Sequence, residues 1–98
     1  MTQVQFASRI MDDIARIEAH LRDNNSGAAG ERIAEISEAL GALAHNPRLG
    51  RPAEDGMREL VIGRDWLGYL ALYRYFGKLE LVLVIALRSQ REDRYNFD

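Results

Sequence analysis

The spacing of apolar residues changes once along this chain, and that change limits its fold more than any other feature. In residues 7–46 apolar side chains recur every three or four positions, as they do on one face of a helix. After residue 56 they mostly alternate with polar residues or form short apolar runs, which is typical of strands. We therefore expect two helices in the first half of the chain and most of the strands in the second half.

The helical part divides into two amphipathic helices. Ser8 can cap the first helix and Ser26 the second, and proline at position 47 ends the second helix because it cannot continue the hydrogen-bond ladder. Between the helices, the turn residues at 24–27 predict an antiparallel helix pair. The expected buried stripes are Ala7, Ile10, Ile14, Ile17 and Leu21 in the first helix, and Ala29, Ile33, Ile36, Leu40 and Leu43 in the second.

Four strands are expected around these helices. The alternating residues 2–6 predict a short first strand, and both prolines lie in residues 47–56, which are expected to form a loop. The later strands are predicted at 57–62, 66–76 and 79–88. The order β-α-α-β-β-β predicts a single α+β domain over residues 1–98, in which the helix pair packs on one face of a curved antiparallel sheet.

The last two strands are expected to form a hairpin with Gly77-Lys78 as its two-residue turn. This register makes the face rich in Leu and Ile the expected core, with Leu81, Leu83, Ile85 and Leu87 under the helices. A loop one residue longer would swap the faces of one strand, so the prediction depends on the turn. The opposite face would lack a cover and would call for a partner. It would carry Tyr69, Tyr73, Tyr75, Val82, Val84, Ala86 and Arg88.

Composition excludes several classes of protein. The chain has no cysteine, so disulfides and thiolate metal sites are excluded. No basic stretch followed by an apolar run is found near the N-terminus, and the run Leu81 to Leu87 is far shorter than the about 20 residues of a membrane-spanning helix. A cytoplasmic protein without membrane contact is therefore expected.

Charge is distributed unevenly, although the net charge is only −2. Residues 1–46 contain seven acidic residues and four arginines, whereas residues 47–98 contain nine basic and eight acidic residues. Any surface that binds an anion is therefore expected in the second half of the chain.

Few residues suit catalysis. His20 and His45 have no spaced second ligand or base, and no phosphate-binding glycine pattern, nucleophile elbow or metal-ligand spacing is present. We expect no metal and no cofactor. The remaining candidates are arginines and a tyrosine, which could bind RNA or an acidic protein segment, or could simply be solvated strand ends. They are Arg51, Arg58, Arg74, Arg88, Arg91 and Tyr95.

The order of elements and several motifs resemble the RelE/ParE superfamily of bacterial toxin–antitoxin toxins, often labelled plasmid stabilisation proteins. The motifs are LGR (49–51), RELVIG (58–63), GYLALYRY (68–75) and LRSQRE (87–92). The resemblance covers nearly the whole chain and implies a small toxin held inactive by a co-expressed antitoxin. The antitoxin's C-terminal segment would cover the tyrosine face, and its N-terminal part, of the ribbon-helix-helix type or similar, would bind DNA.

The superfamily has two functional branches, one that cleaves mRNA in the ribosome and one that poisons DNA gyrase. In the nuclease branch an arginine commonly follows the Gly-Tyr of the middle strand, where this chain has Leu70. Of its two lysines, Arg58 matches one and Leu60 occupies the place of the other. This incomplete set and the slight acidity favour the ParE-like branch, although Ser89 stands where many of its members have histidine.

The preferred hypothesis is a gyrase-binding toxin that recognises its target without bond cleavage. Arg51, Arg58, Arg88 and Arg91, with Tyr69 or Tyr73, would contribute to that recognition. In the alternative, a ribosome-dependent endoribonuclease, Arg58, Arg88 and Arg91 would stabilise the scissile phosphate while Tyr95 orients the attacking hydroxyl. A third possibility is an inactive remnant that only binds the antitoxin. Residues 90–98 fit either a short helix or a disordered tail.

Overall fold

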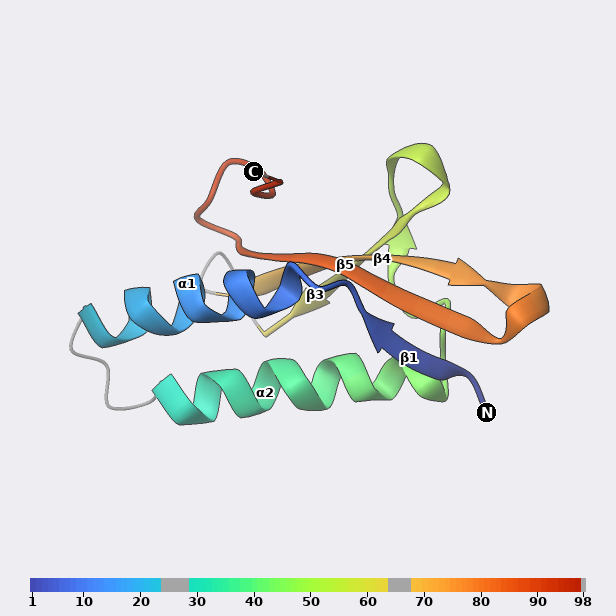
Figure 1. The fold of residues 1–98 in the computed structure, drawn as a ribbon, viewed down its shortest axis with the longest axis horizontal. Helices are drawn as coiled ribbons and strands as arrows, with labels where there is room; N and C mark the ends of the chain where they lie inside the picture. Colours follow the sequence, from blue (N-terminus) through green and yellow to red (C-terminus); the bar gives the residue numbers. More distant parts are fainter. Residues whose placement is uncertain (24–28, 64–67, 98) are drawn as a thin grey trace.

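The structure is a computed structural model that describes residues 1–23, 29–63 and 68–97. It contains two helices and five strands (Figure 1). Their bounds are β1 Gln3–Phe6, α1 Ile10–Asp23, α2 Ala29–Gly41, β2 Arg51–Pro52, β3 Arg58–Ile62, β4 Tyr69–Phe76 and β5 Leu81–Ser89. The predicted cap at Ser26, the predicted turn residues 24–27 and the first two residues of the strand predicted at 66–76 lie outside the described residues.

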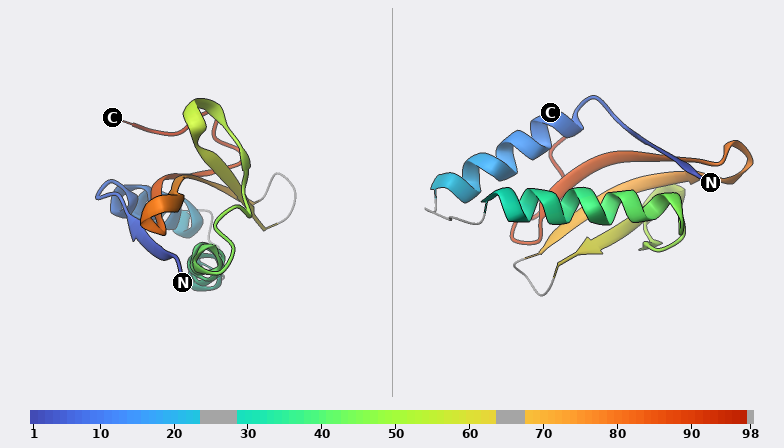
Figure 2. Two further views of the ribbon diagram at one scale, coloured as in Figure 1. Left: turned by 90° about the vertical axis from the view of Figure 1, so that its right-hand side faces the viewer. Right: turned by 90° about the horizontal axis from the view of Figure 1, so that it is seen from below.

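The expected α+β class is confirmed, with one difference in the sheet. The strand order is β1-β5-β4-β3-β2, and β1 pairs with β5 in parallel, so the sheet is mixed and not wholly antiparallel. The antiparallel helices α1 and α2 lie on one side of the sheet (Figures 1 and 2). The C-terminal segment and the loop between β2 and β3 lie on the other side. Inside the predicted loop 47–56, Arg51–Pro52 adds the short edge strand β2.

The predicted hairpin register is wrong. Residues Gly77–Leu79 form a 3-10 turn and Glu80 adopts a left-handed conformation with φ +50°. The connection is therefore longer than the two-residue turn expected, and Phe76 pairs with Leu81. Relative to the expected register, β5 is displaced by two residues along β4. Side chains alternate between the two faces with a period of two, so those near the turn stay on their expected faces.

A second irregularity changes the faces farther from the turn. Tyr73 pairs with Val84 but Leu72 pairs with Ala86, so Ile85 forms a bulge in β5. After the bulge, Leu87 lies on the same face as Tyr73 and Val84, while Arg88 lies on the opposite face. A two-residue turn at Gly77-Lys78 would place Tyr69 opposite Ala86, whereas Tyr69 pairs with Ser89.

The face that packs under the helices is the tyrosine face, which corrects the expected core. The expected apolar stripes of the two helices do pack into the core. The sheet, however, contributes tyrosine and valine side chains to the core in place of the expected Leu81, Leu83 and Ile85. Those three residues are only half-buried. The core comprises Ile10, Ile17, Leu21, Ile36, Leu40, Leu43, Leu60, Ile62, Tyr69, Ala71, Tyr73, Val82, Val84 and Leu87.

Tyr73 explains why a tyrosine face can be a core. Its side chain is 0% exposed, and its hydroxyl donates to the Pro47 carbonyl (2.7 Å) and accepts from the Gly50 N–H (2.8 Å). A Cβ at Gly50 would lie 2.7 Å from the tyrosine ring, so only glycine fits there. Burial of the phenol is tolerated because the loop at 47–50 satisfies its hydrogen bonds.

Side chains of α1 complete the edge of β5 that β1 leaves open. The β1–β5 pairing ends at Phe6 and Val84. Farther along, the Asp13 carboxylate accepts the Leu87 N–H (3.0 Å), and Arg16 donates to the Leu87 carbonyl (3.1 Å). Asp13 is 1% exposed, and its charge is balanced by Arg16 at 2.7 Å and Arg9 at 3.1 Å.

Candidate functional site on the outer face

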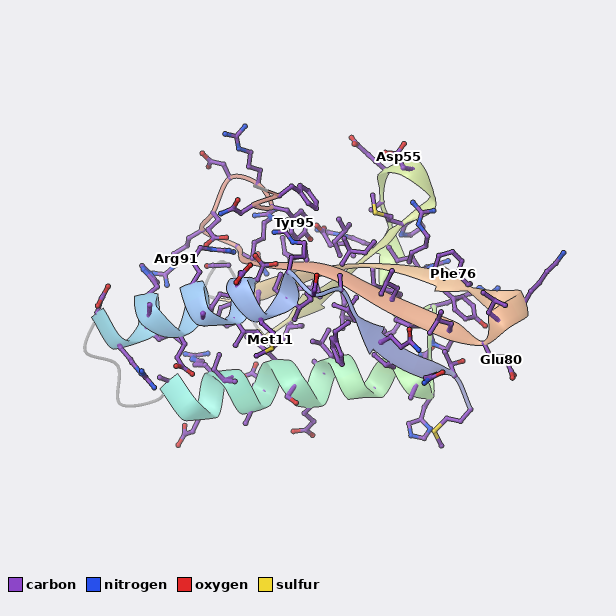
Figure 3. All side chains as sticks on the ribbon, in the orientation of Figure 1. Met11, Asp55, Phe76, Glu80, Arg91 and Tyr95 are labelled. Atoms are coloured by element: carbon purple, nitrogen blue, oxygen red, sulfur yellow. The ribbon has the colours of Figure 1, made fainter. Side chains whose placement is uncertain are left out.

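The sheet face opposite the helices, here called the outer face, is where three of the predicted functional side chains meet: Arg51, Arg88 and Tyr95. It carries Glu59 from β3 and Arg88 from β5, since these residues pair with Leu72 and Leu70 of β4. The C-terminal segment, residues 91–97, turns back over this face and brings Tyr95 above it (Figure 3).

Glu59 is the centre of the site. Its Oε1 accepts two hydrogen bonds from Arg51 (2.6 and 3.1 Å), and its Oε2 accepts one from the Tyr95 hydroxyl (2.6 Å). Burial raises the pKa of this carboxyl, but the hydrogen bonds from Tyr95 and Arg51 outweigh burial, so the net pKa lies below its ordinary value. Glu59 is therefore ionised at neutral pH.

Tyr95 has the opposite shift. Burial, followed by the hydrogen bond to Glu59, raises the pKa of its phenol well above the ordinary value. The phenol of Tyr95 therefore keeps its proton and donates it in a hydrogen bond to the ionised carboxylate of Glu59. In this arrangement the phenol is poorly suited to act as a general base.

Arg88 is engaged by the C-terminal segment. Its Nη1 donates to the Glu92 carbonyl and more weakly to the Ser89 carbonyl (3.4 Å), while its guanidinium carbon lies 5.1 Å from the Tyr95 ring centroid. Within the described part of the chain, its buried Nε has no hydrogen-bond partner. Arg88 is thus half-buried between the sheet and the C-terminal segment and contacts both the backbone and a side chain of that segment.

Two further arginines hold this segment from the side of α1. Arg16 binds both carboxylate oxygens of Glu92 (3.0 and 3.1 Å), and Arg9 lies over the Phe97 ring at 4.6 Å. The hydrogen bond to Glu92 is the main cause of the raised pKa of Arg16. Arg16 and residues 91–97 surround an open pocket of about 780 Å³.

The predicted arginines do not form one site. Arg58 pairs with Tyr73 on the helix side of the sheet and donates to the carbonyls of Gly50 (2.6 Å) and Arg48 (3.3 Å). The sheet therefore separates Arg58 from Arg88 and Tyr95. Arg51 has a side chain that is 62% exposed beside Glu59. Arg91 is also exposed, and it borders a pocket of about 210 Å³ with His20, Tyr69 and Ser89 among its lining residues.

The residues expected to contact the antitoxin are mostly inaccessible from outside. Tyr69, Tyr73, Val82 and Val84 belong to the core, and the expectation that they form an uncovered face is wrong. Ala86 is buried on the outer face at 0% exposure. The remaining one, Tyr75, is partly buried with the Arg48 guanidinium 5.0 Å from its ring centroid.

An apolar groove that was not predicted from the sequence lies between β1, α1 and α2. It encloses about 380 Å³, and two of its lining residues are prominently exposed, Phe6 at 52% and Met11 at 70%. Met11 stands beside the expected helix stripe in the sequence, which was the signal for this groove. The lining residues are Phe6, Ala7, Ser8, Ile10, Met11, Ile14, Ile33, Ile36, Ser37 and Leu40.

The described residues contain neither a cluster of metal-ligating side chains nor a helix that could span a membrane. No group of three or more histidine, aspartate or glutamate side chains is placed to hold a metal ion among residues 1–23, 29–63 and 68–97. Over the same ranges, neither helix has the length and apolar character needed to cross a membrane.

Comparison with known proteins assigns the family. Residues 4–94 match the family described as the ParE toxin of the type II toxin–antitoxin system parDE. The chain belongs to the ParE toxin family. A relative in Sinorhizobium fredii strain NGR234, Y4kP, which is described as a candidate toxin, is 28% identical over 89 residues, or 90% of this chain and 91% of that protein. The expected RelE/ParE resemblance, on its ParE-like side, is confirmed.

Solved structures show the same fold. The chromosomal ParDE toxin–antitoxin system from P. aeruginosa contains a chain with a TM-score of 0.75 and 22% identity, covering 91% of this ParE-family chain and 96% of that one. The intact E. coli RelBE toxin–antitoxin complex gives a TM-score of 0.58 at 15% identity, with 96% and 100% coverage. These likenesses support the arrangement of two helices and a mixed sheet.

Proposed function

We propose that this ParE-family chain inhibits growth by binding DNA gyrase in the cytoplasm, and that a cognate antitoxin neutralises it. Gyrase is preferred as the target because the sheet separates the residues that a nuclease would need to bring together. Arg58 lies on the helix side of the sheet, and the Tyr95 proton is held by Glu59 on the outer face. This geometry favours recognition of a protein target over phosphate cleavage.

The exposed arginines Arg51 and Arg91 are the proposed contacts with gyrase. Arginine is common among residues that dominate protein interfaces, because its planar guanidinium makes several directed hydrogen bonds. Arg58 is assigned a different role, which is to hold the loop at 47–50 in place through its two carbonyl contacts.

A supercoiling assay with purified toxin and gyrase tests this proposal. The toxin is expected to inhibit supercoiling and to produce a cleaved DNA–gyrase complex, and Arg91→Ala is expected to weaken inhibition about tenfold. Arg22→Ala is the matched control, since its side chain is 70% exposed on α1 and away from the outer face. Unchanged supercoiling together with mRNA cuts in the ribosomal decoding site would support the nuclease alternative.

The apolar groove between β1, α1 and α2 is the proposed docking site for the antitoxin. Its exposed apolar residues need cover, and the free edge of β1 can pair with an extended segment. The excess of acidic residues in 1–46 favours an antitoxin segment that carries basic residues beside its apolar ones.

Co-expression with the reading frame upstream of the toxin gene tests the docking site. Met11→Glu is expected to abolish rescue of growth while leaving toxicity unchanged, because a charge in the groove opposes apolar docking. Leu49→Glu is the control, as Leu49 is 50% exposed outside the groove. Rescue of the Met11 variant would refute the groove assignment, and antitoxin binding without any toxicity of the wild-type chain would identify an inactive remnant.

A further inference from the structure

The C-terminal segment 91–97 is held over the outer face by contacts with three different elements. Tyr95 reaches Glu59 of β3, Glu92 binds Arg16 of α1, and Arg88 of β5 lies against both the segment's backbone and the Tyr95 ring. Figure 3 shows Tyr95 pointing back toward the body of the protein, while Arg91 lies closer to α1.

These contacts are polar or between a cation and a ring, and they differ in kind from the packing of the core. The Gln90 N–H donates to the Gly68 carbonyl (3.0 Å), and the N–H groups of Arg91 and Glu92 donate to the hydroxyl and the carbonyl of Ser89 (3.2 and 3.0 Å). The other contacts described above are made by side chains of the segment or by Arg88. Phe97 remains 60% exposed. Segments with few buried apolar contacts open at a lower free energy than the core of a domain.

The segment also engages Arg88 and Glu59, polar groups of the outer face that would otherwise be open to a target. The Arg88 guanidinium donates to the Glu92 carbonyl and faces the Tyr95 ring, so it cannot present its hydrogen-bond fork to another molecule. Glu59 likewise has one oxygen bound to Arg51 and the other to Tyr95.

We propose that residues 91–97 form a strap that masks Arg88, and that the hydrogen bond between Tyr95 and Glu59 is its latch. When the latch opens, Arg88 becomes available as an additional contact for the toxin's target. The identity of that target rests on the proposed function, but the masking of Arg88 does not.

Residue-resolved labelling with phenylglyoxal, which modifies accessible arginines, tests the masking directly. Tyr95→Phe removes only the latch hydroxyl, and the full-length variant is expected to label at Arg88 about tenfold faster than the wild type. Exposed Arg22 serves as the internal reference. Tyr75→Phe is the matched control, since it removes a phenol oxygen from the other face of the sheet and is expected to leave the rate unchanged.

Glu59→Gln provides a second variant that opens the latch from the opposite side. It is expected to raise Arg88 labelling like Tyr95→Phe, whereas Arg51→Ala, which leaves the Tyr95 hydrogen bond in place, is expected to raise it less. Equal labelling of Arg88 in the wild type and both latch variants would overturn the proposal.

The gyrase assay separates the strap from the proposed function. If Arg88 is unmasked and gyrase is the target, Tyr95→Phe inhibits supercoiling at a lower concentration than the wild type. Faster labelling with no inhibition by either protein would refute gyrase as the target and leave the strap supported. Faster labelling with equal inhibition would overturn the claim that Arg88 adds a target contact.

Discussion

The two faces of the sheet are closed in different ways, although the same β4–β5 hairpin supplies both. On the helix side, apolar side chains interlock and the fully buried phenol of Tyr73 has both hydrogen bonds satisfied by a loop. On the outer face, a short segment is held by ion pairs, cation–π contacts and a phenol–carboxylate hydrogen bond. The first arrangement fixes the fold, whereas the second leaves a surface that can open.

The largest expected effect on stability comes from substituting a leucine of β5, and it differs between the two faces of the sheet. Leu87→Ala is expected to lower the free energy of unfolding by about 3 kcal/mol, because Leu87 is 0% exposed in the core. Leu81→Ala, which truncates a half-buried side chain on the outer face, is expected to lower the free energy of unfolding by less than about 1 kcal/mol. Urea unfolding measures both, and equal losses would show that the two faces are packed alike.

A smaller effect is expected at the edge of β5. Asp13→Asn is expected to lower the free energy of unfolding by about 2 kcal/mol, because a neutral amide replaces the carboxylate that binds Arg9, Arg16 and the Leu87 N–H. Asp12→Asn is the control, since Asp12 is the exposed neighbour. Thermal unfolding monitored by circular dichroism compares them, and a similar loss in both variants would contradict a special role for Asp13.

The next smaller effect on stability is expected from removing the buried hydroxyl of Tyr73. Tyr73→Phe is expected to lower the free energy of unfolding by about 1.5 kcal/mol, because it leaves the Pro47 carbonyl and the Gly50 N–H without their partner. Amide exchange at Gly50, followed by NMR, is expected to accelerate in this variant. In Tyr75→Phe the Gly50 amide is expected to exchange at the wild-type rate, and acceleration in both would refute the local explanation.

The smallest effect depends on pH. The pKa of Glu59 is lowered in the folded protein, so its contribution to stability is present above its unfolded pKa of about 4.3 and is lost as pH falls through the lower folded value. The stability difference between wild type and Glu59→Gln is therefore expected to shrink between pH 6 and pH 3. Chemical unfolding at several pH values measures it, and a difference that grows toward acid pH would contradict the sign of the shift.

The sequence predicted the elements well because their signals are local. The helix stripes, Pro47 and the alternation after residue 56 depend on neighbours within a few positions. The faces of the sheet could not be predicted in the same way, because both faces of β5 are apolar from Leu81 to Leu87 and hydrophobicity does not choose between them. The bulge at Ile85 turned Leu87 toward the helices, and the loop that satisfies Tyr73 allowed the tyrosine face to be buried. The left-handed Glu80 changed the register by two residues and left the faces near the turn as expected.

The candidate site was predicted only in part for a related reason. Arg51, Arg88 and Tyr95 were identified by residue type and by resemblance to the family, and they do meet on the outer face. Glu59, which brings them together, was missed because its partners lie 8 and 36 positions away in the chain. Arg58 was grouped with them, although alternation along β3 places neighbouring side chains on opposite faces.

The parallel pairing of β1 with β5 has a consequence for the order in which the toxin acquires its structure. Strand β1 has β5 as its partner, and the ribosome makes β5 after β2, β3 and β4. Asp13 of α1 also lacks one of its hydrogen-bond partners until β5 is made, since its carboxylate accepts the Leu87 N–H. A nascent chain that lacks β5 therefore cannot assemble this sheet, and the folded toxin appears only after β5 has been made.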